Sequence, residues 1–397
     1  MTEPASTAAE PSRVVLFGAT GYTGRLVAEA MVERGMRPVL AARSEDKLAE
    51  LADDLGGGLE TRAADVEEPQ TIGELVGRGD VLVSTVGPFV RFGAPAVAAA
   101  ATHGAHYLDS TGEPPFIREV FQRYGDAAEK GGCGLLTAFG YDFVPGNLAG
   151  ALALERAGDA AVRVDVGYFF TGQNRPSGGT LSSLAGVVTE EGFAYRDGRV
   201  QAERAARHAR RFQVGSKDRG AISVGGSEHF ALPRIARQLE EVRVYLGWFG
   251  PVSRALPAMS LGGSVMLKLP GVRNLWDAGR SRFIKGSTGG PDEEERSRGG
   301  SHIVGIAYDA GGDQLSEVHV SGVNGYTFTG RILAWGAQRA ATAGPRGTGA
   351  LGPVDAFGLR ELEQGCAEAG LTVEDDDGGT RRKSAPEAAR EPAKTGA

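Results

Sequence analysis

Three glycines, each three residues after the last, lie near the start of this chain in the segment GATGYTG. The segment follows a short apolar run at residues 13–17 and opens residues 22–34, which have the apolar period of a helix. At such a turn one glycine permits the bend, one lets the backbone approach a pyrophosphate, and one lets helix and strand pack closely. Free N–H groups at the helix start favour the anion. The turn predicts a dinucleotide-binding loop, with a ligand-free turn as the alternative; the contacting residues would be Gly18, Thr20, Gly21, Tyr22, Thr23 and Gly24.

Apolar runs and amphipathic segments continue to alternate after this turn. Strands are expected at residues 13–17, 38–42, 60–64, 80–84, 106–109 and 133–137. Helices are expected at residues 22–34, 45–55, 94–103 and 115–130, with a short one before residue 80. Strands and helices at this spacing form βαβ units around a parallel sheet. The chain is therefore predicted to be of the α/β class, with a doubly wound Rossmann domain at residues 13–146.

The alternation stops after residue 146. Strand patterns occur at residues 162–170 and 242–248, and residues 302–308 and 314–321 flank a glycine-rich turn as in an antiparallel hairpin. Helical patterns occur at residues 181–189 and 326–342, whereas residues 281–300 are rich in glycine and charge and predict a mobile loop. We expect an α+β domain for substrate binding or dimerisation at residues 147–325 and C-terminal helices at 326–372. The ends, residues 1–12 and 373–397, have too few apolar residues to fold and are expected to be disordered.

Charge and cysteine usage restrict the classes of protein. The net charge of −7 argues against nucleic-acid binding through a basic surface. Only two cysteines occur, Cys133 and Cys366, so a disulfide framework is not expected and a reducing cytoplasm fits. No apolar stretch is long enough to span a bilayer, and the first residues lack the pattern of a signal peptide. These features predict a cytoplasmic globular protein.

The end of the second expected strand indicates which dinucleotide binds. Sites for NAD place an acidic residue here, which accepts a hydrogen bond from the ribose 2′-hydroxyl. This chain has Arg43 instead, with Ser44 beside it and Lys47 one helical turn on. A guanidinium binds a phosphate through two parallel hydrogen bonds, so the 2′-phosphate of NADPH is the expected partner. A surface arginine at a strand end without a ligand is the alternative.

Two further segments are expected near the cofactor. Asp65 follows the third strand and would face the adenine amino group, or else cap the next short helix. Thr85, Val86, Gly87 and Pro88 follow the fourth strand, at the edge of a parallel sheet where ligands bind. They would approach the nicotinamide ribose, and a structural turn is the equally weighted alternative.

Several segments taken together resemble a known family. GATGYTG, LAARS, STVGPF, HYLDSTGE and GYDFVPGN, in this order, resemble segments of the saccharopine dehydrogenase-like oxidoreductases. That superfamily includes the trans-acting enoyl reductases of actinobacterial lipid and polyketide pathways. TGGPDEEERSRGG and GVNGYTFTGRILAWGAQRA are also similar to this family, so the resemblance runs from residue 13 to about residue 372. It implies an N-terminal NADP-binding Rossmann domain, an inserted α+β domain, and C-terminal helices that pack back on the Rossmann part.

One loop departs from the pattern of this family. Many relatives carry Cys-Gly-Phe-Asp-Ser-Ile-Pro-Ser-Asp in a loop that borders the nicotinamide. Here the same stretch is FGYDFVPGN, residues 139–147. The aspartate and the proline match, as Asp142 and Pro145, whereas both serines and the final aspartate are replaced.

The resemblance implies an NADPH-dependent reductase of an unsaturated acyl or polyketide-type substrate, free or carrier-bound, in secondary metabolism. Reduction of an imine formed from an amino acid and a carbonyl compound is an alternative, for which Arg175 would bind a carboxylate. A non-catalytic NADPH-binding regulator is a third reading, because a fold does not fix a reaction. The hydride acceptor must be held against the nicotinamide, and the developing charge needs a donor. The candidates near that position are Tyr107, Asp109, Thr111, Glu113, Tyr141 and Asp142, with structural roles as the alternative for each.

Other chemistries have less support in the sequence. No tyrosine is followed four positions later by lysine, so the short-chain dehydrogenase mechanism is disfavoured. His103 and His106 are predicted at a helix end and a strand start, and the other four histidines form no ligand spacing, so no metal site is expected.

A basic segment interrupts the otherwise acidic chain. Its cationic residues between positions 204 and 219 are Arg204, Arg207, Arg210, Arg211, Lys217 and Arg219. The segment is predicted to be a solvated helix face. The alternative is a docking surface for an acidic carrier protein or a coenzyme A phosphate.

Overall fold

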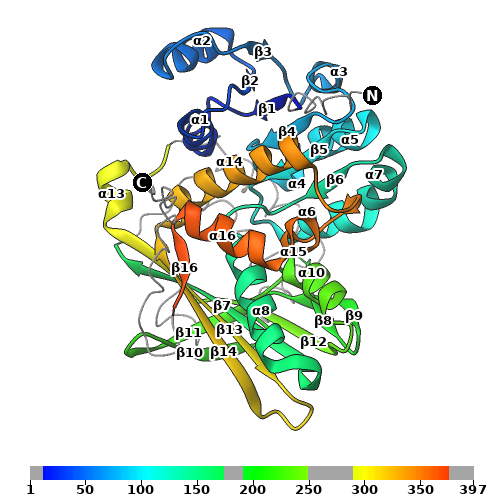
Figure 1. The fold of residues 1–397 in the computed structure, drawn as a ribbon, viewed down its shortest axis with the longest axis vertical. Coiled ribbons are helices and arrows are strands. Elements are labelled where there is room, and N and C mark those ends of the chain that lie inside the picture. Colours follow the sequence, from blue (N-terminus) through cyan, green and yellow to red (C-terminus); the bar gives the residue numbers. More distant parts are fainter. Residues whose placement is uncertain (1–11, 174–190, 249–288, 375–397) are drawn as a thin grey trace, which may run out of the picture.

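Seven parallel strands form the first sheet of the computed structural model, which describes residues 12–173, 191–248 and 289–374 (Figure 1). The strand order is β15-β6-β5-β4-β1-β2-β3, and every adjacent pair is parallel. β1 and β4 are buried throughout, as expected for strands covered on both faces. The strands are β1 (Val14–Phe17), β2 (Val39–Ala42), β3 (Thr61–Ala63), β4 (Val81–Ser84), β5 (His106–Asp109), β6 (Gly134–Leu136) and β15 (Gly349–Ala350).

The predicted doubly wound α/β domain is confirmed by this strand order. Strand order reverses between β1 and β4, which is the point where an open parallel sheet of this kind binds its ligand. Helices connect the strands: α1 (Tyr22–Glu33), α2 (Glu45–Asp54), α3 (Pro69–Gly73), α4 (Phe89–Phe92), α5 (Ala94–His103), α6 (Pro114–Glu119), the π-helix Val120–Tyr124 and α7 (Gly125–Gly131).

A nine-stranded mixed sheet forms the lower half of the molecule in Figure 1. Its main order is β10-β11-β12-β7-β13-β14-β16, and β8 pairs with both β12 and β9. The β7–β12 pair is parallel, whereas β7–β13 and β13–β14 are antiparallel. The strands are β7 (Arg163–Gly172), β8 (Glu191–Arg196), β9 (Arg199–Arg204), β10 (Ala209–Val214), β11 (Lys217–Val224), β12 (Glu241–Leu246), β13 (Gly299–Tyr308), β14 (Gln314–Val323) and β16 (Leu371–Val373).

Helix α8 (Val144–Ala157) packs on this second sheet, against β7, β13 and β14. Its residues 144–154 are all buried, because the helix lies between the sheet and α10 (Glu228–Ile235), α15 (Pro353–Phe357) and α16 (Leu359–Ala369). A single turn of 3₁₀ helix, Gly158–Ala160, leads from α8 into β7. One hydrophobic core joins the first sheet, these helices and the inner face of the second sheet.

The long helix α14 (Gly325–Ala343) follows β14 and returns the chain to the first sheet. It packs against α1 and crosses β4 and β5, as the orange helix of Figure 1 shows. The return of the C-terminal helices is therefore as expected. The two short strands in this C-terminal part belong to different sheets. β15 joins the first sheet, whereas β16 adds to the edge of the second.

Three predictions of local structure need correction. Residues 293–297, expected in a mobile loop, form helix α13 because Asp292 and Glu295 make a reciprocal capping box at its start. The basic segment is not a helix face: it contains the end of β9 and the hairpin β10–β11. Val373 is not in a disordered tail but pairs with Val320 of β14.

The hairpin predicted around residues 310–313 is confirmed as β13–β14. The predicted helix at residues 181–189, Arg175, residues 281–288 and both predicted disordered ends, up to residue 11 and from 375, lie outside the described residues. In the part of the chain that is described, no helix is long and apolar enough to cross a membrane. The domain boundaries drawn from the sequence remain a prediction.

Candidate functional site

The glycine turn lies between β1 and α1, at the reversal point of the first sheet. Gly18 has a φ of +88°, a left-handed conformation that glycine adopts without strain. A Cβ on Gly24 would lie 2.1 Å from the carbonyl oxygen of Gly18 and 2.8 Å from that of Ala19, so only glycine lets α1 approach β1 this closely. Gly21 is the N-cap of α1, where no side chain caps the helix. The N–H groups of the first turn are therefore left for another acceptor.

Contacts of Thr85 and Tyr22 hold this turn in place. The hydroxyl of Thr85, directly after β4, donates to the carbonyl oxygens of Gly18 (3.1 Å) and Phe17 (3.3 Å). Tyr22, at the start of α1, donates its hydroxyl to the carbonyl oxygen of Pro291 at 2.6 Å, and its ring contacts that of Tyr326 edge-on at 5.4 Å. Burial raises the pKa of Tyr22. Thr85 and Tyr22 thus support the loop through contacts that the sequence did not indicate.

The residues expected around the adenosine end are at the ends of β2 and β3. Arg43 is exposed, and its guanidinium has no partner within residues 12–173, 191–248 and 289–374. Ser44 is the N-cap of α2 and accepts a hydrogen bond from the backbone N–H of the exposed Lys47 at 3.4 Å. Asp65 does not cap α3; its carboxylate accepts from the backbone N–H of Glu67 at 3.0 Å, so it stabilises the turn after β3.

Val86, Gly87 and Pro88 lie between β4 and the short helix α4. The carboxylate of Glu113 holds this segment, because its two oxygens accept from the backbone N–H groups of Phe89 at 2.9 Å and Val90 at 3.0 Å. Glu113 therefore orients the turn that was expected near the nicotinamide. The structure gives it a positioning role that its place in HYLDSTGE did not reveal.

Two candidates on β5 are enclosed by protein. Tyr107 and Asp109 are both 0% exposed, and Tyr107 belongs to the apolar core on one side of the first sheet. Asp109 accepts from the backbone N–H groups of Thr111 (2.9 Å) and Ala138 (2.8 Å) and from the hydroxyl of Thr137 (2.8 Å). Burial raises its pKa to about 6. The expectation of direct catalysis by these two residues is not supported, because neither side chain is accessible; Asp109 instead ties the end of β5 to the end of β6.

The loop after β6 brings the other two candidates to the same edge. Tyr141 is buried, and its hydroxyl donates to the carbonyl oxygen of Phe169 at 3.2 Å. Its backbone N–H donates to the hydroxyl oxygen of Thr329 on α14 at 3.0 Å. Asp142 is part-exposed as a residue, but its Oδ1 is buried and has no hydrogen-bond partner in the described structure. Its Oδ2 lies close to Gly112: a Cβ added to Gly112 would be 2.9 Å from this oxygen. Burial raises the pKa of Asp142 to about 7.

A second buried carboxyl lies near Asp142 and was not predicted. Glu228, at the start of α10, is 0% exposed, and its Oε1 accepts from the hydroxyl of Tyr168 at 2.5 Å. Burial raises its pKa to about 8, and the nearby charge of Asp142 adds to that shift. Its Oε2 has no hydrogen-bond partner among the described residues. Glu228 and Tyr168 lie 60 positions apart, in segments without a recognisable motif, so only the fold brings them beside Asp142.

The raised pKa of Glu228 predicts a pH-dependent stability. Between the ordinary value of 4.5 and about 8, the folded chain keeps this proton while the unfolded chain releases it, so the free energy of unfolding falls as pH rises through that window. One group changes it by at most about 1.4 kcal/mol per pH unit. We expect Glu228→Gln to flatten this slope in urea unfolding measured from pH 5 to pH 8, whereas the exposed Glu240→Gln should leave it unchanged. Equal slopes in wild type and Glu228→Gln would contradict the raised pKa.

Comparison with known proteins shows a family likeness in the first domain. Residues 14–135 match the family model described as the saccharopine dehydrogenase NADP binding domain. Over these residues the chain is similar to the saccharopine dehydrogenase-like oxidoreductases. Its first domain is the NADP-binding domain of that family.

Two mycobacterial relatives are similar to part of this chain. A Mycobacterium tuberculosis protein is 36% identical over 186 residues, which are 44% of each chain. The trans-acting enoyl reductase of Mycobacterium leprae is 39% identical over 140 residues, 34% of each chain. The matched region thus spans less than half the length of these curated relatives. A solved saccharopine dehydrogenase of Saccharomyces cerevisiae is similar in fold, with a TM-score of 0.55 over 91% of this chain and 99% of that one, at 12% identity.

The departure from the family's loop pattern has a structural explanation. Gly146 stands where many saccharopine dehydrogenase-like relatives carry the second serine. A Cβ here would lie 1.9 Å from the hydroxyl oxygen of Tyr168 and 2.5 Å from Oε1 of Glu228. Asn147, in place of the final aspartate, donates to Phe143 and to Ser227, each at 2.9 Å. The glycine therefore makes room for the Tyr168–Glu228 pair, which brings a carboxyl to this edge from the second domain.

Proposed function

We propose that this protein is an NADPH-dependent reductase of unsaturated acyl thioesters. The observation that carries the proposal is that the glycine turn after β1 and Asp142 after β6 lie at the same edge of the first sheet, and that burial raises the pKa of this carboxyl to about 7. The names of the mycobacterial relatives supply the class of substrate. Bound NADPH supplies a hydride, and an enoyl thioester that receives it at its β-carbon must then gain a proton at its α-carbon.

The residues of the first domain fit the cofactor. We infer that the first turn of α1, with Gly18, Gly21 and Gly24, receives the pyrophosphate, because its N–H groups have no side-chain cap. Arg43, Ser44 and Lys47 would surround the 2′-phosphate at the end of β2. Thr20, Tyr22 and Thr23 would line the turn, Asp65 would lie at the adenine, and Thr85, Val86, Gly87 and Pro88 would lie toward the nicotinamide ribose.

Arg43→Ala tests the assignment of the 2′-phosphate. A hydrogen bond to a charged group contributes about 1.5–3 kcal/mol, so the variant should lose roughly 10- to 100-fold in affinity for NADPH and keep its affinity for NADH. The dissociation constants of both cofactors can be measured from NAD(P)H fluorescence. Arg91→Ala is the matched control, since Arg91 is an exposed arginine of the same domain that lies over the ring of Phe92 instead. A preference for NADPH that survives Arg43→Ala would exclude this assignment.

An aromatic cluster next to Asp142 suits an acyl chain. The ring of Phe170, near the end of β7, stacks on Tyr141 with 5.3 Å between centroids and on Trp248 with 4.8 Å. Such a surface binds the methylene groups of an acyl chain. This observation favours the enoyl substrate over the imine.

The substrate class can be tested with purified protein. NADPH oxidation should occur with an enoyl thioester and be absent with a ketone or with a keto acid and an amine. Oxidation with the keto acid and amine alone would indicate the saccharopine-type reaction instead. Binding of NADPH without oxidation by any substrate would favour the regulator.

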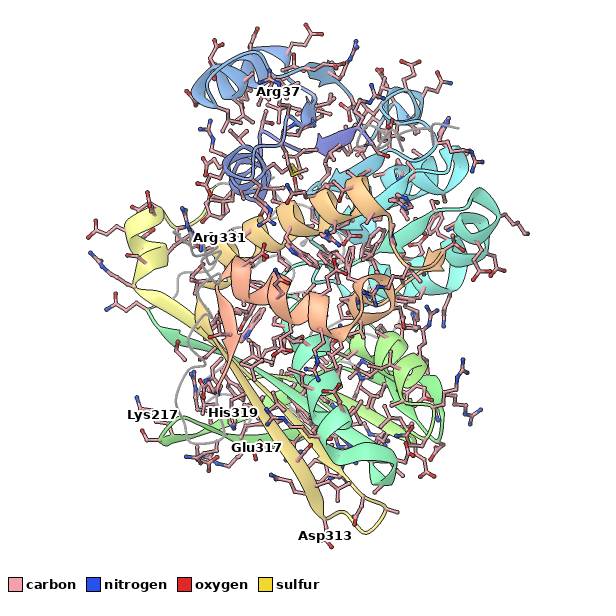
Figure 2. All side chains as sticks on the ribbon, in the orientation of Figure 1. Arg37, Lys217, Asp313, Glu317, His319 and Arg331 are labelled. Carbon is pink, nitrogen blue, oxygen red and sulfur yellow. The ribbon has the colours of Figure 1, made fainter. Side chains whose placement is uncertain are left out.

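A carrier-bound substrate and a cytoplasmic location are part of this proposal. The basic residues from Arg204 to Arg219 remain a candidate docking surface, although several are already engaged: Arg207 pairs with Glu203, Arg210 with the buried Asp165, and Arg211 with Asp218. Charge reversal at positions 207, 210 and 211 would therefore also disturb the fold. Lys217, exposed at the start of β11 (Figure 2), is a better site for charge reversal.

A further inference from the structure

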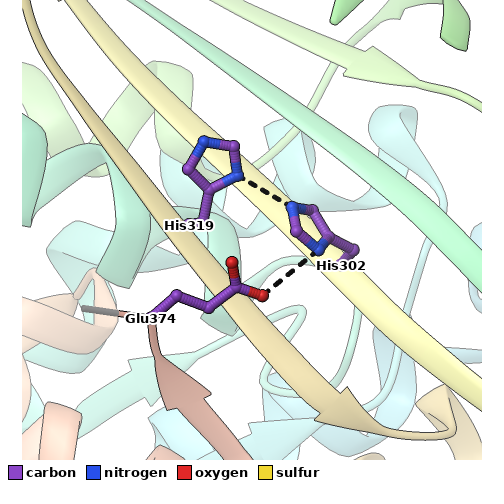
Figure 3. A group of neighbouring side chains, drawn as sticks. All are labelled: His302, His319 and Glu374. Atoms are coloured by element: carbon purple, nitrogen blue, oxygen red, sulfur yellow. Dashed lines mark hydrogen bonds and ion pairs between the residues drawn. The ribbon is translucent and has the colours of Figure 1, made fainter. Parts of the chain in front are cut away.

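Two histidines on neighbouring strands and a glutamate that follows a third strand meet on the second sheet (Figure 3). His302 lies on β13, His319 on β14, and Glu374 directly follows β16. Ligand atoms of the three side chains lie within 4.8 Å of one another. The register pairs His319 with Val304, so the two imidazoles are diagonal neighbours across the hairpin. Sequence spacing separated these histidines by 17 residues, and the hairpin brings them together.

Each imidazole has one nitrogen that faces a carboxylate. Nε2 of His319 lies 2.8 Å from Oε1 of Glu317, and Nδ1 of His302 lies 3.5 Å from Oε1 of Glu374. A carboxylate can only accept, so these two outer nitrogens favour carrying the hydrogens. The inner nitrogens, Nε2 of His302 and Nδ1 of His319, then present lone pairs to each other across 2.8 Å.

Those facing lone pairs require a positive species between them. If His302 carries its hydrogen on Nε2 instead, its Nδ1 lone pair faces the Glu374 carboxylate, and this contact is then repulsive. The carboxylates of Glu317 and Glu374 both face this pair of imidazoles and favour a cation between them. The guanidinium of Arg219, which donates to the carbonyl oxygen of Phe170, adds one positive charge nearby. A carboxylate that fixes the outer nitrogen of a histidine is also the usual support of a metal-bound imidazole.

We propose that His302, His319 and Glu374 bind a divalent transition-metal ion, with Zn²⁺ as the best match. Two imidazoles and one carboxylate are a donor set that zinc favours. At Zn–N distances of about 2.0–2.1 Å, tetrahedral nitrogens lie roughly 3.3 Å apart, so the imidazoles need to separate by only about 0.5 Å. Glu317 orients His319 from outside the site, whereas the Glu374 carboxylate would turn from Nδ1 of His302 toward the ion to bind it. The side chains of Glu374 and His319 are 25% and 26% exposed, which leaves a route for the ion.

The site would fasten the end of the second sheet. It would join β13, β14 and the residue that follows β16, and so fix the short edge strand formed by Leu371–Val373. The inference does not depend on the proposed reductase activity, because it rests on residues that the reductase proposal does not use.

The test uses the full-length protein freed of metal by dialysis against a chelator. We expect Co²⁺ to bind at one equivalent with the visible absorption of a nitrogen- and oxygen-ligated ion, and Zn²⁺ to displace it. His302→Asn, His319→Asn and Glu374→Gln should each weaken Zn²⁺ binding by more than about 100-fold, and Glu317→Gln by about 10- to 100-fold. His208→Asn is the matched control, since His208 lies 3.8 Å from the carboxylate of Glu203 without a second histidine ligand.

Thermal unfolding gives a second readout. Zn²⁺ should raise the melting temperature of the wild type and of His208→Asn, and should not raise that of His319→Asn. Circular dichroism of each variant shows whether it is folded. Absence of stoichiometric Co²⁺ and Zn²⁺ binding by the wild type, or binding that survives His302→Asn with His319→Asn, would overturn the proposal and leave a proton shared between the imidazoles.

Discussion

Gly24→Ala is expected to abolish NADPH binding. The added Cβ would lie 2.1 Å from the carbonyl oxygen of Gly18 and 2.8 Å from that of Ala19, and neither backbone atom can move without displacing the turn. The start of α1 must then shift away from the pyrophosphate. Loss of two hydrogen bonds to charged oxygens, at about 1.5–3 kcal/mol each, corresponds to roughly 100- to 10,000-fold in affinity. The dissociation constant of NADPH, measured by fluorescence, checks this result.

A milder change at the same turn separates local clash from general destabilisation. A Cβ on Gly21 would meet the Gly18 carbonyl oxygen at 3.3 Å, with φ at −77°, so Gly21→Ala should bind NADPH more weakly than wild type but more tightly than Gly24→Ala. Thermal unfolding establishes that both variants are folded. If folded Gly24→Ala binds NADPH as the wild type does, the cofactor does not use this turn.

Asp142→Asn is expected to lower kcat by about 10²- to 10⁴-fold, the range that general acid catalysis contributes. Asparagine keeps the size of the side chain and cannot supply the proton. Burial raises the pKa of Asp142 to about 7, so a large share of this carboxyl is still protonated at neutral pH. Because the acid must be protonated to act, the wild-type rate should fall as pH rises through about 7. Steady-state kinetics with an enoyl thioester would show both effects, with NADPH affinity unchanged.

Two comparisons sharpen this prediction. Asp109→Asn changes another buried carboxyl, but one that binds two backbone N–H groups and a hydroxyl, so we expect lower stability rather than a changed pH profile. Glu228→Gln removes a carboxyl whose charge interacts with that of Asp142. We therefore expect it to shift the alkaline limb of the pH–rate profile and to leave kcat measurable. Full activity of Asp142→Asn with an unchanged pH profile would exclude Asp142 as the proton donor.

Much of the first domain could be predicted because its information is local. The turn around Gly18 and Gly24 lies within one βα unit, and the strand periods on either side fix the parallel sheet. Arg43 follows β2 directly, so its place at the edge of the sheet came from the sequence as well. The family resemblance rests on the same N-terminal segments.

The rest of the candidate site could not be predicted because its contacts join distant segments. Tyr107 and Asp109 lie in a motif that suggested chemistry, yet their burial depends on helices and strands packed around β5. The basic segment has the composition of a solvated helix, but pairing with Asp165 and Asp218 stabilises strands there. Long-range pairing overrides local propensity in a sheet.

A Rossmann domain with a glycine turn after its first strand followed from the sequence alone, because each of its signals lies within a few residues of its partner. Only the tertiary structure set the surroundings of the carboxyls: it enclosed Asp109 in a hydrogen-bond network, left Oδ1 of Asp142 without a partner among the described residues, and placed Glu228 near Asp142. It also joined His302 to His319. In each case burial and the approach of separate strands set the charge state and the partners, and neither quantity can be read from the order of residues.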